Sequence, residues 1–131
     1  MHDRGMKLDE ALGQLYAQGL LAVARVDGEI GPEEGALLRK LVTDRTSLEI
    51  DYEQSFFHKV TSDELAAAVA KAGVDAREVG RAFASDAAQL AVADGDLNGG
   101  EAQLILRYVR ALGCSDDDIR HATRELDAWL Y

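Results

Sequence analysis

The chain has 131 residues, of which 47% are hydrophobic and 29% charged, so it is long enough to bury one core and has the composition of a globular domain. Its 14 basic residues against 24 acidic ones give a net charge of −10, which repels the phosphate backbone and excludes nucleic acid as a partner. The long uncharged run over residues 11–24 is shorter than the roughly 20 apolar residues of a membrane span, and the first five residues lack a signal-peptide core, so we expect a cytoplasmic protein.

The first part of the chain predicts a pair of helices. Apolar residues at steps of three and four, from Leu8 to Val26, indicate one helix over about residues 7–26. Gly31, Pro32 and the two acids that follow form a typical helix start, which predicts a second helix to about residue 43. A polar break at residues 43–47 follows, and a weaker apolar pattern over residues 50–60 predicts a third helix.

Two capping boxes predict where the next helices begin. Thr61 precedes Glu64 by three residues, and Asp75 precedes Glu78 by the same spacing. In this arrangement the first side chain and the glutamate each accept a hydrogen bond from a backbone N–H that the helix leaves unpaired. We therefore expect helices that start near residues 62 and 76.

The last part of the chain carries three amphipathic patterns. Apolar stripes predict core-facing helices over residues 76–93 and 101–112, and Gly113 is expected to end the second of them. Ser115 and the three acids after it then start a final helix, whose apolar stripe runs from Ile119 through Trp129 to Leu130. Cys114 is the only cysteine, so we expect a small buried apolar side chain rather than a disulfide or a zinc ligand.

The two halves of the chain repeat one motif. The segment 24–34, with Asp27-Gly28 at its centre, aligns with the segment 91–101, with Asp94-Gly95, at a constant offset of 67 positions (94 − 27). The same offset pairs apolar residues of the following helices, so the repeats cover about residues 8–43 and 76–112. With no segment that alternates with period two, we predict an all-α fold: a compact single-domain bundle of six or seven helices over residues 1–131, containing two Asp-Gly helical hairpins.

The motif carboxylates predict a cation site. Asp27 and Asp94 each lie at the C-terminal end of a helix, where the helix dipole disfavours a carboxylate by about 0.3–1 kcal/mol. A bound Ca²⁺, Mg²⁺ or Mn²⁺ would offset that cost, because carboxylates and helix-end carbonyls offer the oxygen ligands that hard cations prefer. Alternatively, the aspartates accept hydrogen bonds within their own turns, and Glu34 and Glu101 act only as capping-box acids.

An EF-hand is excluded as the form of this site. The run Asp94-Gly95-Asp96 resembles the opening of such a loop, but Ile105 occupies the twelfth position, where the loop needs a bidentate acid. The two Asp-Gly-x-[Ile/Leu]-x-x-x-Glu units instead resemble the signature of the TerB-like family, small all-helical domains named for tellurite-resistance operons and also found in a DnaJ-type co-chaperone.

This resemblance implies a divalent-metal site and a role beside stress-response partners, with an unidentified protein partner at the inner-membrane surface. It points to Asp27, Glu34, Asp94 and Glu101 as metal ligands, with Glu29 and Asp96 as second choices. The second motif departs from the first, because Gly99-Gly100 replaces Pro32-Glu33 and one acid is lost. No enzymatic activity is implied.

Three hypotheses for the function follow. The first is a metal-binding, stress-associated accessory domain. The second is a protein-interaction module without a metal site, in which the same acids are only turn and cap residues. The third, ranked well behind, is a Mg²⁺-dependent helical nucleotide hydrolase, a class whose acids lie in the middle of helices rather than at their ends.

Overall fold

The computed structural model describes residues 10–25, 32–46, 60–93 and 97–130, with the backbone alone at residues 10–11, 32–34 and 44–46. Within these ranges the chain forms six α-helices and one short 3-10 helix, and it contains no strand. The elements are α1 (Glu10–Ala24), α2 (Pro32–Thr46), α4 (Ser62–Ala72), α5 (Ala76–Ala93), α6 (Gly99–Ala111), α7 (Asp116–Ala122) and η1 (Asp127–Trp129). The predicted all-α bundle is confirmed.

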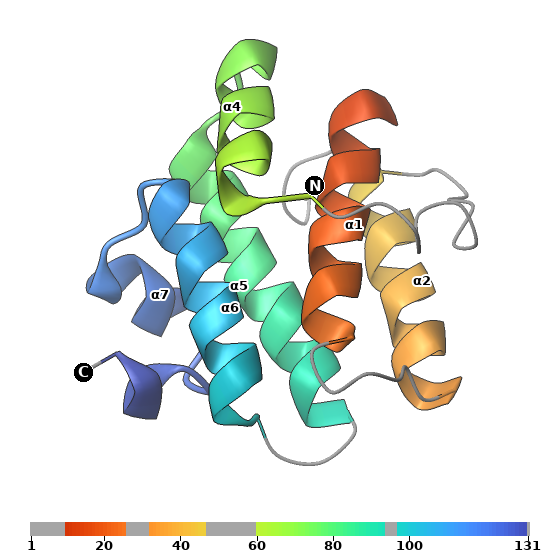
Figure 1. Ribbon diagram of the computed structural model, residues 1–131, viewed down its shortest axis with the longest axis vertical. Coiled ribbons are helices and arrows are strands. Elements are labelled where there is room, and N and C mark those ends of the chain that lie inside the picture. Colours follow the sequence, from red (N-terminus) through yellow and green to blue (C-terminus); the bar gives the residue numbers. More distant parts are fainter. Residues whose placement is uncertain (1–9, 26–31, 47–59, 94–96, 131) are drawn as a thin grey trace.

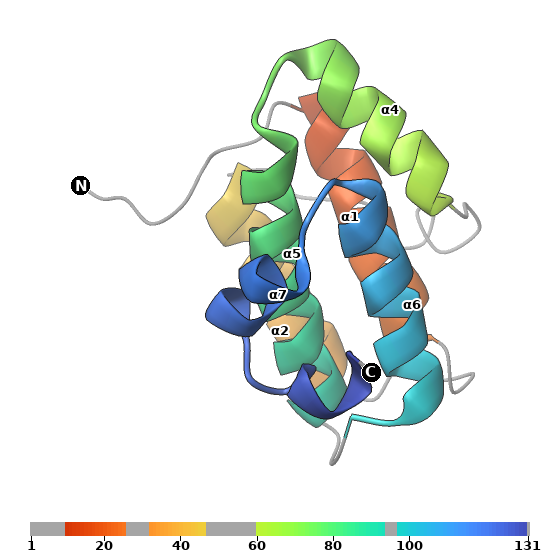
Figure 2. The same cartoon turned by 90° about the vertical axis from the view of Figure 1, so that its left-hand side faces the viewer.

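Helix α5 lies at the centre of the bundle and packs against α1, α2, α4, α6 and α7. Helices α1 and α2 run antiparallel on one side of it, and α6 runs antiparallel to it on the other (Figures 1 and 2). Helix α4 contacts α1, α5 and α6. In the described part of the chain, no helix combines the length and the apolar character needed to cross a membrane.

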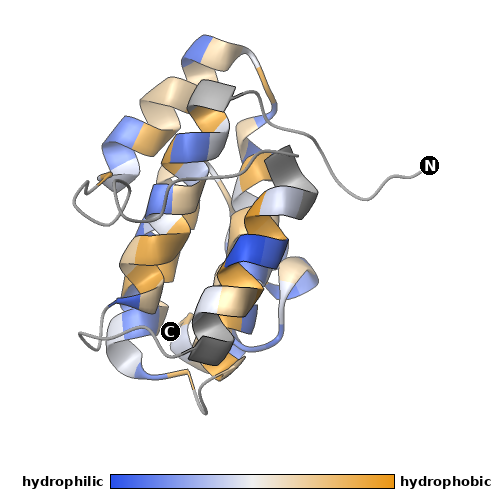
Figure 3. Ribbon diagram, turned by 90° about the vertical axis from the view of Figure 1, so that its right-hand side faces the viewer, coloured by the Kyte–Doolittle hydropathy of each residue, from blue (hydrophilic) through white to orange (hydrophobic). Residues whose placement is uncertain are grey.

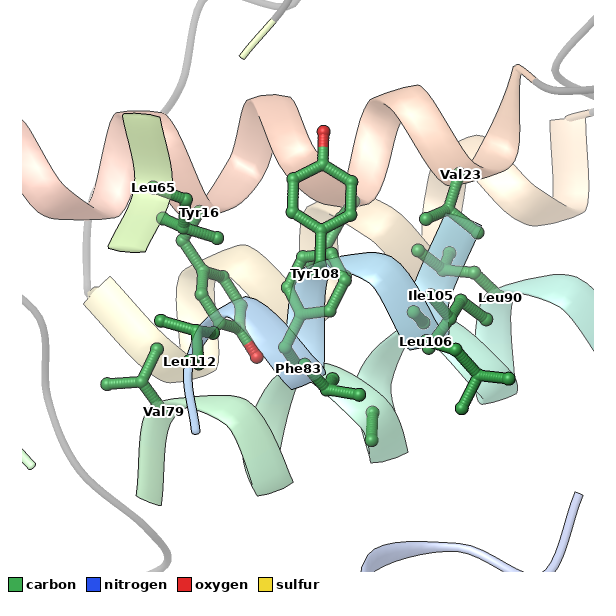
Figure 4. Packing of buried hydrophobic residues seen from close by; sticks show 14 of the residues in the cluster. Tyr16, Val23, Leu65, Val79, Phe83, Leu90, Ile105, Leu106, Tyr108 and Leu112 are labelled. Carbon is green, nitrogen blue, oxygen red and sulfur yellow. The ribbon is translucent and has the colours of Figure 1, made fainter. Parts of the chain in front are cut away.

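Three aromatic rings form the centre of the core. The Phe83 ring of α5 makes an edge-to-face contact with Tyr16 of α1, at a centroid distance of 5.5 Å, and a tilted contact with Tyr108 of α6, at 5.0 Å (Figure 4). Such aromatic pairs add about 0.5–1.5 kcal/mol beyond the burial of their area. The rings therefore fix how the pair of helices α1 and α2 packs against the pair α5 and α6.

Aliphatic side chains surround the aromatic rings. The stripe predicted for α5 is fully buried, and the hydrophobic segments of the helices alternate with hydrophilic ones along each ribbon, as expected of amphipathic helices (Figure 3). The buried stripe residues of α5 are Val79, Phe83, Ala87 and Leu90. Cys114 is also buried, as predicted.

The predicted caps begin and end the helices. Thr61 and Glu64 form the full capping box at the start of α4. Asp75 Oδ1 accepts hydrogen bonds from the backbone N–H groups of Arg77 and Glu78, which is one half of the box predicted at the start of α5. Gly113 adopts a φ of +88° just after α6, a left-handed conformation that glycine reaches without steric cost.

The predicted end of the second helix was wrong. Helix α2 continues through the predicted polar break to Thr46. Residues 43–46 contain neither glycine nor proline, and polar side chains alone do not end a helix in contact with water. The third predicted helix, over residues 50–60, lies outside the described residues except for Val60, which is buried.

The final helix was also predicted too long. Helix α7 ends at Ala122, and Thr123 takes an extended conformation, with its hydroxyl accepting a hydrogen bond from the backbone N–H of Glu125. The chain then turns back, and η1 packs against α6. Leu126 and Trp129 reach the core through this turn rather than along one straight helix.

Candidate functional site

The described residues include one complete side chain among the six predicted metal ligands. Asp27, Glu29, Asp94 and Asp96 lie outside the described residues, and the side chain of Glu34 does as well. Only Glu101 can be placed. No group of three or more His, Cys, Asp or Glu side chains that could hold a metal ion is found within the ranges that the structure describes. The metal site stays a prediction.

Glu101 forms the capping box that its sequence position predicts. Its backbone N–H donates to Asn98 Oδ1 at 2.8 Å, and its Oε1 accepts from the Asn98 backbone N–H at 3.1 Å. The residue is only 4% exposed, so this carboxylate is held in one place at the N-terminus of α6. A carboxylate has about four acceptor positions on two oxygens, so the cap is compatible with a further ligand.

The helix ends that flank the two motifs lie at the same end of the bundle. Helices α1 and α5 both end there, and α2 and α6 both begin there (Figures 1 and 2). Pro32 and Gly99, the first residues of α2 and α6, are separated by the repeat offset of 67 positions (99 − 32). We refer to this part of the molecule, formed by the ends at Ala24, Pro32, Ala93 and Gly99, as the hairpin end.

The electrostatics of the helix ends differ across the bundle. Helices α4, α6 and α7 each carry a basic side chain in the last turn, which favours their negative dipole ends. Helices α1 and α5 carry none in their last turns. Arg25 follows α1 directly, but the side chain lines a pocket against α4 and α6. The end of α5 therefore has a partial negative charge without a basic side chain in its last turn.

Trp129 packs beside the hairpin end. A Cβ added at Gly99 would lie 3.4 Å from the indole, so the ring rests against the first residue of α6. Trp129 is partly buried against the core, which confirms the expected packing. Because it is the only tryptophan, its fluorescence reports on the surroundings of the second motif.

An ion-pair cluster joins α5 to α7 away from the hairpin end. The carboxylate of Asp118 accepts two hydrogen bonds from Arg77, with Oδ2 at 3.0 Å from Nε and Oδ1 at 2.8 Å from Nη2. Its Oδ1 also accepts a hydrogen bond from Arg81 at 3.3 Å. The Arg77 hydrogen bonds, followed by those from Ser115, hold the pKa of Asp118 well below its usual range. The sequence placed Asp118 in a first helical turn, but no local signal predicted its partners on α5.

Cys114 lies beside this cluster and is the only described free thiol. Burial, and then the negative charge of Asp118, raises the pKa of the thiol to about 11. A Cβ added at Gly80 would clash with the Cys114 sulfur, so only glycine at this position lets α5 come this close to the thiol. The thiol thus has a packing role in this structure.

The comparisons with known proteins identify one family. The model of the family described as tellurite resistance protein TerB matches residues 14–124, nearly the whole chain. Neither the curated proteins nor the solved structures gave a match. The matched range contains both Asp-Gly motifs, the whole of α2, α5 and α6, and α1 from residue 14 onward. The chain therefore belongs to the TerB family.

Proposed function

We propose that this TerB-family domain binds a divalent cation, Ca²⁺, Mg²⁺ or Mn²⁺, through the carboxylates of its two Asp-Gly hairpins, and that it acts as a non-enzymatic accessory domain in a stress response. The observation that carries the proposal is the position of the four helix ends. The helices on both sides of each motif have their ends at the hairpin end, so both motifs connect helix ends that lie there.

The donor chemistry of the hairpin end supports a hard cation. Asp27 and Asp94 follow the negative ends of α1 and α5, and Glu101 adds a buried, fixed carboxylate at the start of α6. Carboxylate and carbonyl oxygens are the ligands that Ca²⁺ and Mg²⁺ prefer. A cation would also be favoured by the end of α5, where the last turn holds no basic side chain.

A protein partner fits the charge of the chain. A net charge of −10 favours encounter with a basic surface, and we propose a partner of that kind, in the cytoplasm at the inner-membrane surface. The alternative function is an interaction module without a metal, in which the motif acids serve only as turn and cap residues. The capping box of Glu101 supports this alternative for one of the six acids.

Thermal unfolding of the EDTA-stripped protein tests the cation. Binding to the native state alone, at about 100 times the dissociation constant, stabilises by roughly 2.7 kcal/mol. For a domain of this size the midpoint should rise by several degrees, and the rise should vanish in the Asp27→Asn/Asp94→Asn variant. The tryptophan fluorescence should change over the same cation concentrations, because Trp129 rests on Gly99.

A variant with the same change in charge controls for general electrostatics. Asp63 and Glu78 are exposed acids in the first turns of α4 and α5, away from the hairpin end. The Asp63→Asn/Glu78→Gln variant should keep the full cation response. A chain that responds to none of the three ions, with hairpin variants that are less stable by about 1 kcal/mol for each lost cap, favours the interaction module instead.

The same variants test the cellular role. A host strain that lacks the gene should regain stress tolerance, tellurite tolerance first, with the wild-type gene and not with the Asp27→Asn/Asp94→Asn gene. Hydrolysis of nucleoside triphosphates by the purified protein with Mg²⁺ would contradict the non-enzymatic role.

A further inference from the structure

A pocket of about 380 Å³ lies between the last turn of α1, the start of α4 and the middle of α6. These three helices contact one another in pairs, with α4 beside α1 and α6 (Figures 1 and 2). Glu101, the one predicted metal ligand with a described side chain, is not among its described lining residues. The pocket is therefore a different feature from the proposed cation site.

The inner wall of the pocket is apolar. Leu21 of α1 and Val60, just before α4, are buried, and Leu104 of α6 is partly buried against the core. The Tyr108 hydroxyl donates a hydrogen bond to the Val60 carbonyl, which ties the start of α4 to α6. Burial raises the pKa of Tyr108 to about 12, so the phenol stays neutral and the wall carries no charge there.

Two arginines contribute positive charge to the pocket. Arg25 follows α1 and Arg107 belongs to α6, and both line the pocket. Ser62, the first residue of α4, adds a hydroxyl, and the positive end of the helix dipole lies at the same point. The carboxylate of Glu64 opposes this field, and its Oε1 accepts a hydrogen bond from the Thr61 backbone N–H in the capping box.

The charge of this pocket differs in sign from that of the whole molecule. The chain has a net charge of −10, yet two of its 14 basic residues meet at one apolar cavity. Within the described part of the chain, Arg107 forms no ion pair with a carboxylate. The planar fork of a guanidinium binds carboxylates with two parallel hydrogen bonds.

We propose that this pocket binds a small free organic acid, a carboxylate on a short apolar chain, with the carboxylate held by Arg25 and Arg107 and the chain against Leu21, Val60 and Leu104. Its volume lies near the lower end of the range for small-molecule sites, about 300–1,000 Å³. That size accommodates a chain of several carbons.

Octanoate is the probe, with octanamide as its uncharged counterpart. We expect ¹H–¹⁵N spectra of the full chain to show saturable shifts at Ala22, Ser62 and Leu104 with octanoate, and at least tenfold weaker binding of octanamide. Arg107 is exposed, so Arg107→Gln should fold normally and bind octanoate about tenfold more weakly. Arg124→Gln, which makes the same charge change at an exposed residue outside the pocket, should bind as the wild type does.

Any of four results would overturn the proposal. Equal binding of octanoate and octanamide would show that the pocket binds apolar chains whether or not they carry a charge. Equal loss in the Arg107→Gln and Arg124→Gln variants would show only a general effect of net charge. Shifts confined to residues outside the pocket, or tighter binding of a peptide that ends in leucine with a free carboxylate, would assign the anion to another site or another kind of ligand.

Discussion

The hydrogen bond between Tyr16 and Asp86 offers the sharpest test of the core. The Tyr16 hydroxyl on α1 donates to Asp86 Oδ2 on α5 at 2.6 Å, and the two residues are 0% and 1% exposed. The bond therefore connects the two hairpins inside the core. Tyr16→Phe removes the hydroxyl and keeps the ring contact with Phe83.

The expected loss of stability in Tyr16→Phe depends on the acceptor of the hydrogen bond, which is a carboxylate. A hydrogen bond to a carboxylate contributes about 1.5–3 kcal/mol to stability. The entropy of unfolding for 131 residues is about 0.28 kcal/mol/K, so the melting temperature of Tyr16→Phe should fall by about 5–11 °C. The same loss should appear as a lower urea midpoint with an unchanged slope.

Tyr108→Phe is the matched control. Tyr108 belongs to the same aromatic group, but its hydroxyl donates to a neutral backbone carbonyl, that of Val60. A neutral hydrogen bond contributes about 0.5–1.5 kcal/mol, so this variant should melt only about 2–5 °C lower. Circular dichroism at 222 nm follows both transitions.

A double-mutant cycle with Asp86→Asn isolates the pair. The coupling energy between Tyr16→Phe and Asp86→Asn should be of the order of 1 kcal/mol. If Tyr16→Phe is no more destabilising than Tyr108→Phe, and the cycle gives no coupling, the hydrogen bond does not hold the hairpins together and our account of the core is wrong.

Two further predictions concern titratable groups beside α7. The depressed pKa of Asp118 means that its ionised form is stabilised by folding, so this stabilisation is complete above the unfolded pKa of about 3.9 and is lost as the pH falls below it. The difference in urea midpoint between the wild type and Asp118→Asn should therefore shrink from pH 6 to pH 2; a constant difference would contradict the ion-pair account. For Cys114, a pKa of about 11 leaves about 0.1% of the thiol as thiolate at pH 8, whereas about 24% is thiolate in the unfolded chain. Iodoacetamide should therefore alkylate the native protein at least 100-fold more slowly than the protein unfolded in urea. Equal rates by mass spectrometry would show that the thiol is neither buried nor shifted.

The sequence predicted only part of the candidate site. The repeated motif singled out six acids, and the capping-box spacing correctly predicted the bonds between Asn98 and Glu101. That success is local, because a cap depends on residues three positions apart. Whether the other five acids approach one another depends on segments outside the described residues, and their ligand role stays a proposal.

The sequence by itself determined the helices, because their signals act over three or four residues. The capping residues Thr61 and Ser115, the stop at Gly113 and the buried stripe of α5 all follow from such spacings. The same reasoning failed at Thr123, because an apolar stripe is equally satisfied by one straight helix and by a turn that returns the chain to the core.

Only the tertiary structure decided which distant residues meet. The Tyr16–Asp86 bond joins positions 70 residues apart, and the Arg77–Asp118 pair joins positions 41 apart. The pocket that gathers Arg25 and Arg107 draws on three separate helices. Such contacts depend on how amphipathic faces pack around α5, and no periodicity along the chain encodes that choice, because any apolar face can bury against any other of suitable shape.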